Sequence, residues 1–474
     1  MPRISTAIFT WRKDRLKVAV QARAPEAEVI RELLSPWACS FTSLDQAEVA
    51  IAYNEKPSET KKTIAVPSNS SSFARWTEAI KLRVSTCHGE PISLFTNSGI
   101  ELKAHPRVAY SFDGRGGSRP HNTQEIFRQI DDYLLFLSVD VVKEYKNILF
   151  ETLNVKPTPL YRFLTGLPIP YTYAPTKTRE FLMGKTEKQN VANLCDVLSL
   201  DALRHILATA IEKLSKKKLV TNTWKGKKCA VLLTHDIDTG RGLRRAGQLK
   251  RIESKYGVRS AWFVPSKRYR LDLEIVKELA DWGEVGAHDT KHDGRLGAIS
   301  MDRLVPRLRE ARQMLEIIVR EKITGFRAPL LEHNSSILQA LGLAGYSYDT
   351  SIPTWEPRHP TTMKPHGIST VFPLFIGSVL EIPVSLPQDH QLMKISKLRP
   401  HEAIHQWVSM INTIKQMNGL CTILVHPDYE LADQTNLGTY EELLNVLTSD
   451  NELLLSLPRE IVTLTDETKA EFRV

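Results

Sequence analysis

The sequence predicts an α/β protein whose C-terminal part is a complete or slightly broken (β/α) barrel, preceded by a separate, smaller α/β domain. Seven short apolar runs in the second half of the chain are bounded by glycine, proline or polar residues, as strands usually are. Segments with helical periodicity lie between most of them, and strands joined by crossover helices pair in parallel. So many strand–helix units fit a barrel, with a doubly wound open sheet as the alternative. The chain also has 474 residues, more than one core normally holds.

The predicted strands of the barrel follow one another along the chain at residues 229–234, 260–265, 284–288, 324–328, 346–350, 379–386 and 421–426. The clearest helix between them is expected over residues 300–322, where Pro306 predicts a late start or a kink. One flank of this helix is expected to be buried, because apolar residues recur there at helical spacing. They are Leu304, Leu308, Ala311, Leu315 and Ile318.

Residues 1–214 are predicted to form the separate α/β domain, whose role the sequence does not indicate. A helical stretch is expected at 123–145, and strand-like runs lie at 47–53, 63–67 and 91–95. We interpret residues 215–227 as a linker, because the segment "EKLSKKKLVTNTWKGKK" is rich in lysine and charge runs are usually solvated. A phosphate- or lipid-facing patch is the alternative. The barrel domain then takes residues 228–474.

Composition narrows the function classes. The chain has 63 lysine and arginine residues against 54 aspartate and glutamate residues, a formal net charge of +9. No nucleic-acid fingerprint accompanies this modest excess, so an enzyme is favoured over a nucleic-acid-binding protein. Five cysteines, an odd number without CxxC spacing, indicate reduced thiols and a cytoplasmic location. Charged residues interrupt the N-terminal apolar run, so neither a signal peptide nor stable membrane insertion is expected.

Two carboxylates close the first predicted barrel strand, in "CAVLLTHDID". Side chains alternate along a strand, so Asp236 and Asp238 face the same way if strand geometry continues through Ile237. Two like charges this close resist joint ionisation unless a cation is near, which favours a metal site. The alternative is that Asp238 caps the following helix, and these residues alone do not decide between the two.

Two histidines follow the third predicted strand, in "GEVGAHDTKHDG". The four-residue spacing of His288 and His292 brings two imidazoles together on a helical turn or tight loop, and imidazole is a common zinc ligand. Alone, such a pair is more often two ordinary surface histidines. With Asp238 added, two histidines and one carboxylate form a set with open positions, the pattern of a catalytic metal site.

Three further strand ends carry ionisable residues: Arg327, Asp349 and His426. Each has an ordinary structural interpretation, as a surface ion pair, a turn cap and a core histidine respectively. With the ends of the first and third predicted strands, ionisable residues close five separate strands. Folding alone hardly explains this pattern, because buried charge is costly without partners. We therefore expect one polar site at the carboxyl ends of the strands.

The motifs at these strand ends resemble those of the NodB-type polysaccharide deacetylase superfamily. The resemblance covers residues 228–457 and consists, in order, of "THDID", "HDTKH", "RAP", "DTS" and "LVH". Within the superfamily, "DIDTGRG", "EVGAHDTKH" and "EIPVSLP" are especially similar to the deformylase that acts on lipid-linked aminoarabinose. The resemblance implies a distorted (β/α) barrel that carries a divalent-metal hydrolase, and it leaves the N-terminal domain out.

The resemblance also implies the metal ligands and the base. Asp238, His288 and His292 would bind one divalent metal, with zinc expected and cobalt or manganese as alternatives. Asp236 would be the catalytic base. The commoner form of the first motif has adjacent aspartates, and here Ile237 takes the second place. Which of Asp236 and Asp238 is the base and which is the ligand therefore stays open.

The remaining roles follow from the same resemblance. His426 would be the catalytic acid, and Arg327 would keep the base ionised and oriented. Asp349 would orient His426 or line the substrate groove. The third motif continues as "LLEHN" where a glycine often stands, so the groove wall is expected to differ from that of the relatives.

These residues together predict a hydrolase that removes an N-acyl group, acetyl or formyl, from a sugar or glycoconjugate. Its substrate would be an N-acylated sugar, a nucleotide-sugar or a lipid-linked sugar. An amidase that acts on a non-carbohydrate small molecule is one alternative, and a binding or scaffold protein with a vestigial metal site is the other. An open cleft with exposed aromatics such as Trp262 or Trp355 would favour a sugar.

Overall fold

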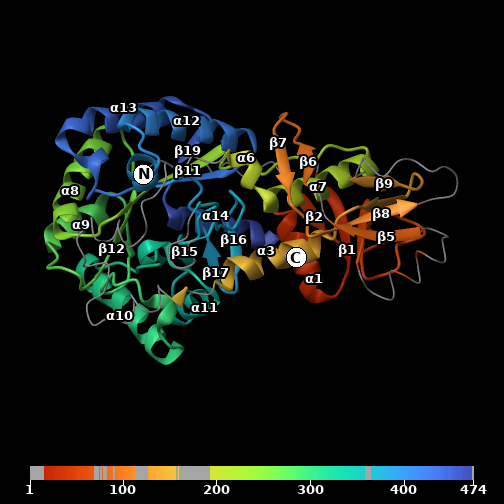
Figure 1. Ribbon diagram of the computed structural model, residues 1–474, viewed down its shortest axis with the longest axis horizontal. Helices are drawn as coiled ribbons and strands as arrows, with labels where there is room; N and C mark the ends of the chain where they lie inside the picture. The colour runs from red at the N-terminus through yellow and green to blue at the C-terminus, as the bar shows by residue number, and fades with distance from the viewer. Residues whose placement is uncertain are drawn as a thin grey trace, which may run out of the picture. The chain divides into compact units, whose positions relative to one another are not determined.

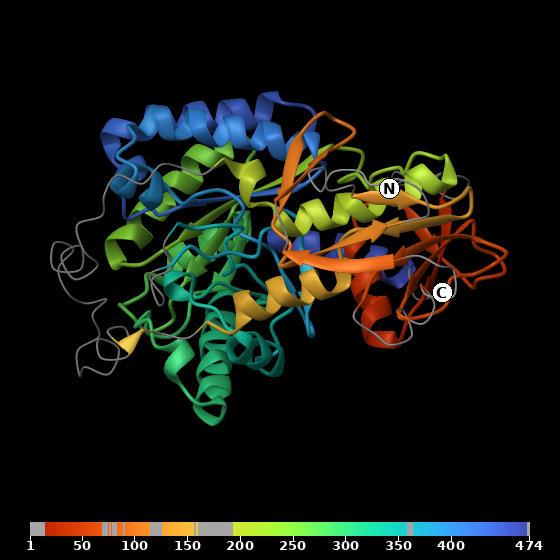
Figure 2. The ribbon, with the colours of Figure 1, turned by 45° about the vertical axis from the view of Figure 1, so that its right-hand side comes forward.

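The computed structural model divides the chain into two compact units, which are described separately below. It describes residues 15–68, 74, 77, 83–88, 91–113, 126–155, 158–159, 193–357 and 364–471. One unit comprises 1–95, 101–147 and 202–222, and the other comprises 96–100, 148–201 and 223–474. The limits 1–214, 215–227 and 228–474 inferred from the sequence stay a prediction. Figures 1 and 2 show the ribbon in two orientations.

The C-terminal unit is built on a nine-stranded sheet that curls into an open, distorted barrel. Neighbouring strands follow the order β16-β17-β15-β14-β13-β12-β11-β18, and β19 also pairs with β11. All pairings are parallel except that of β16 with β17. The strands are β11 (Cys229–Asp236), β12 (Ala261–Val264), β13 (Glu284–Ala287), β14 (Gly325–Phe326), β15 (Tyr348–Asp349), β16 (Leu374–Ile376), β17 (Val379–Glu381), β18 (Leu420–Val425) and β19 (Leu453–Leu455).

The predicted barrel is confirmed in its slightly broken form. β16 and β18 lie at the two ends of the strand path and do not pair with each other within the described residues. Every one of the seven predicted runs contains a strand, although β14 and β15, which lead into the third and fourth motifs, have only two residues each.

Helices connect successive strands and lie outside the sheet, as Figures 1 and 2 show for α8, α9, α10, α12 and α13. Their bounds are α8 (Gly240–Lys255), α9 (Leu273–Trp282), α10 (Met301–Val319), α11 (Ser335–Ala344), α12 (Pro400–Gln416), α13 (Leu437–Ser449) and α14 (Pro458–Glu471). Hydroxyl, carboxylate or amide side chains cap the starts of three of them: Thr239 accepts from the N–H of Gly242 in α8, Asp272 from that of Ile275 in α9, and Asn334 from that of Ile337 in α11.

The helix predicted over 300–322 is α10, which begins and ends slightly inside that range. The late start predicted from Pro306 was wrong, because α10 begins at Met301 and Pro306 lies inside it, where its ring removes one intrahelical N–H bond. Leu304, Leu308, Ala311 and Leu315 are buried as expected, and Ile318 is half-buried. Arg320 ends the helix in the left-handed conformation.

The apolar core of the barrel lies along its axis beneath the strand ends. Ala230 and Leu232 of β11 pack there with residues of neighbouring strands, among them Phe263 and Tyr348, and with Ile461 of α14. Because side chains alternate along β11, the next residues on the same face are Thr234 and Asp236. The inner face of this strand therefore changes from apolar to polar on approaching its carboxyl end.

The N-terminal unit contains a six-stranded sheet with the order β2-β1-β3-β4-β10-β9. Its strands are parallel except for β9, which pairs antiparallel with β10. The strands of this sheet are β1 (Leu16–Gln21), β2 (Cys39–Phe41), β3 (Val49–Tyr53), β4 (Lys62–Val66), β9 (Phe127–Gln129) and β10 (Leu134–Leu137). The predicted α/β character is thus confirmed for this part of the chain.

Two small antiparallel sheets and four further helices complete the described elements of this first half. One sheet pairs β5 (Arg83–His88) with β8 (Val108–Asp113), and the other is the hairpin of β6 (Ile92–Phe95) and β7 (Glu101–Ala104). The helices are α1 (Ala24–Leu33), α3 (Val141–Leu153), α6 (Leu194–Val197) and α7 (Ser199–Ser215).

The prediction of a helix over residues 123–145 was wrong for most of this range. The structure has the hairpin β9–β10 there, and α3 begins only at Val141. Asp131 closes the turn between the strands by accepting from the N–H groups of Tyr133 and Leu134 at 2.7 and 2.8 Å. The apolar β10 is also paired in parallel with β4, and this tertiary pairing outweighs the helical periodicity.

Two further expectations concern cysteines and membranes. Cys39, Cys195, Cys229 and Cys421 form no disulfide bond with one another, and the side chain of Cys87 lies outside the described residues. The cytoplasmic location inferred from the cysteines stays a prediction. Among the helices of the described residues, none combines the length and apolar character that a bilayer crossing requires.

Candidate metal centre

The first two site residues stand where β11 leaves the sheet. All eight residues of β11 are buried, and Asp236 is the last of them. Asp238 follows in the loop that leads to α8. The alternative of Asp238 as a helix cap was wrong, because Thr239 is the N-cap of α8 and accepts from the N–H of Gly242 at 3.1 Å. The Asp238 carboxylate is therefore not committed to the helix.

His288 and His292 meet Asp238 from the loop that follows β13. His292 Nε2 lies 2.8 Å from Asp238 Oδ1, and His288 Nε2 lies 3.5 Å from the same oxygen. One ligand atom from each of the three residues lies within 4.8 Å of the other two. His288 Nδ1–H donates to the carbonyl of Arg327 at 2.8 Å, which directs Nε2 toward the two aspartates.

The donor set fits a divalent cation. Asp238 Oδ1 is buried, two imidazoles converge on it, and no other described group donates a hydrogen bond to it. Burial would raise the pKa of Asp238, but His292 and His288 hold it well below its usual range. Burial would conversely lower the pKa of His288, and Asp236 and Asp238 raise it. The site thus holds a carboxylate as an anion next to two imidazole nitrogens, the mixed donor set that suits zinc and similar ions.

Arg327 occupies the position expected for it, beside Asp236. Its Nη1 donates to Asp236 Oδ1 at 3.1 Å and to Thr234 Oγ1 at 2.9 Å. Its other nitrogens donate to the carbonyl and the hydroxyl of Thr350, and the guanidinium lies over the ring of Phe263. Arg327 is fully buried, so this network fixes the orientation of Asp236 and leaves Asp236 Oδ2 facing the site.

His426 closes β18 on the other side of Asp236, with Nε2 4.0 Å from Asp236 Oδ2. Its Nδ1–H donates to Asp389 Oδ1 at 2.7 Å, and its backbone N–H donates to Asp389 Oδ2 at 2.8 Å. Burial would lower the pKa of His426, but Asp389, with Asp238 and Asp236, raises it to about 10. The carboxylate that orients His426 is therefore Asp389.

The expectation that Asp349 orients His426 or lines the groove was wrong. Asp349 is fully buried and accepts from the hydroxyl of Ser351 at 2.6 Å. Burial raises its pKa to about 6, and burial with Asp349 raises the pKa of Glu381. The two carboxyl groups interact directly and favour a shared proton, close to the charge of Arg327. Asp349 contributes to the network beneath the site and does not reach the surface.

Sequence reasoning missed Asp389, Glu381 and Asp428. Asp389 lies eight residues beyond the end of β17, so a search confined to strand ends does not find it. Asp428 accepts from the N–H of Asp238 at 3.0 Å and from the hydroxyl of Thr239, and it thereby holds the start of α8. A Cβ atom at position 242 would lie 2.2 Å from Asp428 Oδ2. The second glycine of "TGRG" is therefore needed for the close approach of the Asp428 carboxylate to the backbone.

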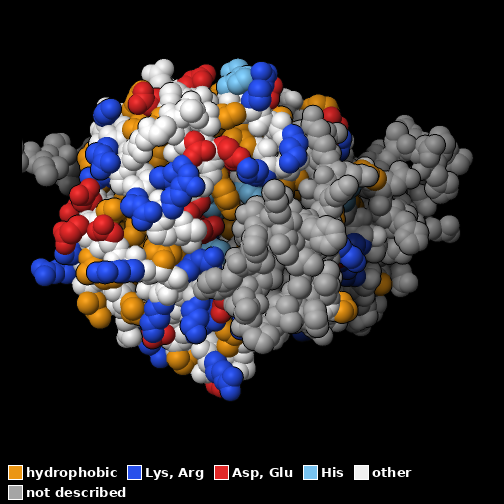
Figure 3. Space-filling model, turned by 60° about the vertical axis from the view of Figure 1, so that its left-hand side comes forward, with side chains coloured by type: hydrophobic (Ala, Val, Ile, Leu, Met, Phe, Trp, Pro, Cys, Tyr) orange, Lys and Arg blue, Asp and Glu red, His pale blue; other side chains and the backbone are white. Residues whose placement is uncertain are grey.

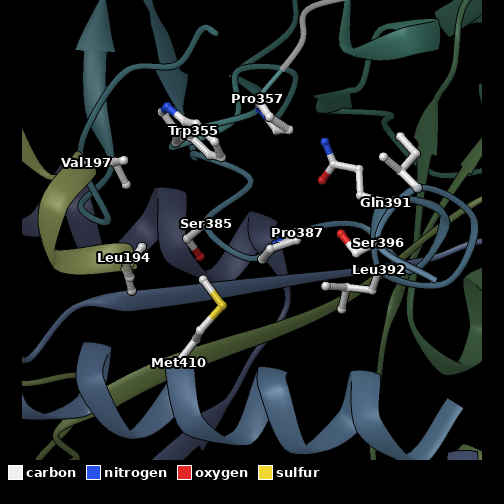
Figure 4. Close-up of a pocket in the computed structure, with 11 residues that line it drawn as sticks. Leu194, Val197, Trp355, Pro357, Ser385, Pro387, Gln391, Leu392, Ser396 and Met410 are labelled. Atoms are coloured by element: carbon white, nitrogen blue, oxygen red, sulfur yellow. The ribbon is translucent and has the colours of Figure 1, made fainter. Parts of the chain in front are cut away.

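The aromatic residues named for the groove differ from each other. Trp262 is fully buried and stacks on His235 at a centroid distance of 4.0 Å, so it was wrong as a groove residue. Trp355 is half-buried and lines a pocket with Pro357 and with side chains of α6, α12 and the segment 385–396 (Figure 4). The described residues that line this pocket are apolar or neutral and polar, and Figure 4 shows Met410 of α12 pointing into it.

One face of the molecule carries side chains of both charges. Figure 3 shows histidine and acidic side chains together near the middle of one face, with lysine and arginine side chains around them. The fold and these residues define a class: an open (β/α) barrel with a candidate metal centre at the carboxyl ends of its strands.

Residues 225–348 match the family model described as polysaccharide deacetylase. The resemblance indicated by the motifs is thus confirmed for this part of the chain, which holds Asp236, Asp238, His288, His292 and Arg327. The particular similarity to the deformylase of lipid-linked aminoarabinose stays a prediction. No curated protein matches the chain.

Solved structures with similar chains include two described as polysaccharide deacetylases. The one from Mycobacterium smegmatis is 19% identical with a TM-score of 0.44, and the one from Pseudomonas aeruginosa PAO1 is 11% identical with a TM-score of 0.45. Each comparison covers 52% of this chain and 94% of the other. An allantoinase is also similar, at 12% identity and a TM-score of 0.41, over 51% of this chain and 91% of that one.

Proposed function

We propose that the chain is a metal-dependent hydrolase that removes an N-acyl group, acetyl or formyl, from a sugar or glycoconjugate. The observation that carries this proposal is the arrangement around Asp236 Oδ2. His288 Nε2 lies 3.9 Å from this oxygen on one side and His426 Nε2 lies 4.0 Å from it on the other. A candidate base, a candidate acid and a candidate ligand thus face one small volume, as amide hydrolysis requires.

Asp238, His288 and His292 would hold the metal, with zinc expected and cobalt or manganese as alternatives. When bound, a divalent ion lowers the pKa of a coordinated water toward about 7 and polarises a carbonyl oxygen. The family match at 225–348 supports hydrolysis of acylated sugars, since these three residues all lie within it.

Asp236 would accept the proton of the attacking water at Oδ2, because Arg327 occupies Oδ1. The two bonds of Arg327 Nη1, to Asp236 Oδ1 and Thr234 Oγ1, fix the orientation of the carboxylate and leave Oδ2 facing the site. His426 would donate a proton from Nε2 to the leaving amine, because Asp389 holds the Nδ1 proton. A positioned histidine of this kind typically contributes about 10² to 10⁴-fold.

The pocket in Figure 4 supports a substrate that carries an apolar group. Pro387 and Gln391 line it, and Asp389, which orients His426, lies between them in the sequence. Two residues span at most about 7 Å of chain, so the pocket adjoins the side of the site where the amine would leave. None of the described lining residues is charged, which favours a lipid-linked sugar over a nucleotide-sugar.

An amidase that acts on a non-carbohydrate small molecule is the second candidate. The observation that favours it is the burial of Trp262, which removes one of the two aromatics expected to stack on a sugar. A binding or scaffold protein with a vestigial metal site stays the third alternative. The cytoplasmic location is part of this proposal.

The test is metal analysis of the purified full-length chain combined with an activity screen. N-acetyl and N-formyl amino sugars, with and without an attached alkyl chain, are compared with cyclic and linear amides. We expect about one divalent ion per chain and turnover of an acylated sugar. The variant His288→Ala, which removes one of the proposed metal ligands, should lose both the bound ion and the turnover. Turnover of simple amides alone would favour the second candidate, and metal-free protein without turnover would favour the scaffold.

A further inference from the structure

The two candidate histidine ligands are anchored in different ways. The imidazole of His288 is fixed by its bond to the carbonyl of Arg327 at 2.8 Å. His292 Nδ1 is buried and has no hydrogen-bond partner among the described residues. Metal-binding histidines almost always use the second ring nitrogen in a bond that fixes the ring. Apart from the contact of its Nε2 with Asp238, the orientation of His292 therefore depends on the backbone that carries it.

That backbone has an unfavourable local conformation. Asp289 and His292 have φ values of 66° and 52°, in the left-handed region that residues with side chains seldom adopt. Such residues persist only where surrounding contacts hold them. One contact is the bond from Arg268 Nη1 to the carbonyl of His292 at 2.7 Å. Another is the bond from the N–H of His292 to Asp289 Oδ2 at 3.2 Å.

Arg307 of α10 connects the two aspartates that flank this loop. Its Nε donates to Asp289 Oδ1 at 2.7 Å, and its Nη2 donates to Asp293 Oδ1 at 2.6 Å. Nη1 adds a bond to Asp293 Oδ2 at 3.2 Å, and Nη2 also contacts Asp289 Oδ2. The Asp289 side chain is fully buried, and those of Asp293 and Arg307 are 7% and 14% exposed. Charge-assisted bonds shielded in this way are strong and directional.

We propose that Arg307 is a positioning residue for the metal ligand His292. By bridging Asp289 and Asp293, it fixes the left-handed turn from which the imidazole of His292 projects toward Asp238. The inference rests on the proposed metal-dependent function and adds to it a residue that touches neither metal nor substrate. Lysine cannot replace it, because a single ammonium does not reproduce the planar fork that engages two carboxylates.

The primary test is a titration of the metal-free chain with Co²⁺, followed by visible absorption, for wild type and Arg307→Lys. We expect the Co²⁺ affinity of the variant to fall by about 10-fold to 100-fold, with a changed absorption spectrum. Arg312→Lys is the matched control. Arg312 lies on the same helix, its side chain is 18% exposed, and it pairs with Glu316 at 3.0 Å. This control should bind Co²⁺ as wild type does.

A second variant tests whether a loss of Co²⁺ affinity results from simple unfolding of the chain. Arg307→Met combined with Asp289→Asn and Asp293→Asn removes the bridge without leaving unpaired buried charges. Its unfolding temperature is measured alongside its Co²⁺ affinity. We expect a cooperative unfolding transition and a weakened affinity. A loss of affinity in a folded chain identifies positioning rather than a general loss of structure.

The route through His292 has its own test. In a chain that already carries His292→Ala, the further change Arg307→Lys should leave the Co²⁺ affinity unchanged, because there is no imidazole left to position. Equal effects of Arg307→Lys with and without His292 would overturn the proposal, as would wild-type affinity in both Arg307 variants. If the wild-type chain binds no divalent ion, the proposed function fails first and the positioning role fails with it.

Discussion

The two sides of the candidate metal centre hold their reacting groups by opposite means. Asp236 is held by the guanidinium of Arg327, which donates to Oδ1 of the carboxylate. His426 is held by the carboxylate of Asp389, which raises the pKa of the imidazole. The His426 side is therefore conditional on pH. We expect the pH dependence of the reaction to come from the His426 side.

The largest effect is expected from Asp236→Asn. Turnover should fall by about 10⁴-fold, because the proton acceptor is lost, while metal content stays nearly unchanged. Asp238→Asn should lose the metal instead. Elemental analysis of both variants, with Asp450→Asn outside the site as control, separates the two roles. The reverse pattern of metal loss would exchange base and ligand.

His426→Ala should have the next largest effect. Hydrolysis of an amide should slow by about 10²- to 10³-fold, because the amine leaves poorly without a proton. Cleavage of an activated ester of the same acyl group should slow much less, since its leaving group needs no proton. Steady-state rates on the two substrates check this. Equal losses on both would mean that His426 only shapes the site.

Asp389→Asn tests whether His426 sets the alkaline limit of the pH–rate profile. The pKa of His426 is raised by Asp389 against the effect of burial, so removing that carboxylate lowers the pKa. An acid acts only below its pKa, and the alkaline limb of the rate profile should therefore move to lower pH. If the alkaline limb of the rate profile does not move in Asp389→Asn, a group other than His426 sets it.

The same pair should also affect the stability of the metal-free chain. A histidine whose pKa rises from the usual 6.5 to about 10 on folding contributes stability that is fully present below pH 6.5. This contribution is lost as the pH rises through about 10. Asp389→Asn should therefore lower the unfolding temperature more at pH 6 than at pH 10. A difference that is the same at both values would contradict the raised pKa.

The smallest effect is expected from Trp355→Ala, which leaves both sides of the centre intact. Loss of apolar surface in the pocket should raise KM for a sugar with an alkyl chain by about 5- to 10-fold. KM for the same sugar without the chain should not change, and neither should kcat. Equal increases in KM for both sugars would remove the pocket from substrate binding.

Much of the barrel follows from local sequence, because its strands are apolar runs with clear boundaries. The ends of β11, β13 and β18 point to Asp236, His288 and His426 for the same reason. Asp389 and Arg307 carry no such signal, since one lies in the segment between β17 and α12, away from any strand end, and the other on a helix 14 residues beyond Asp293. Their partners are set by how loops and helices pack. The hairpin at β9 and β10 was missed because its pairing with β4 is also tertiary.

The close approach of Asp428 to Gly242 limits how this sequence can vary. Even alanine at 242 would collide with a carboxylate that is tied to the backbone of Asp238, whereas Cβ at Gly240 would meet only the ring of Tyr269 at an ordinary 3.7 Å. In a library that randomises "TGRG", position 240 should therefore accept small residues and position 242 should return glycine. At the start of α8, the first glycine can therefore be replaced in the course of neutral evolution and the second cannot.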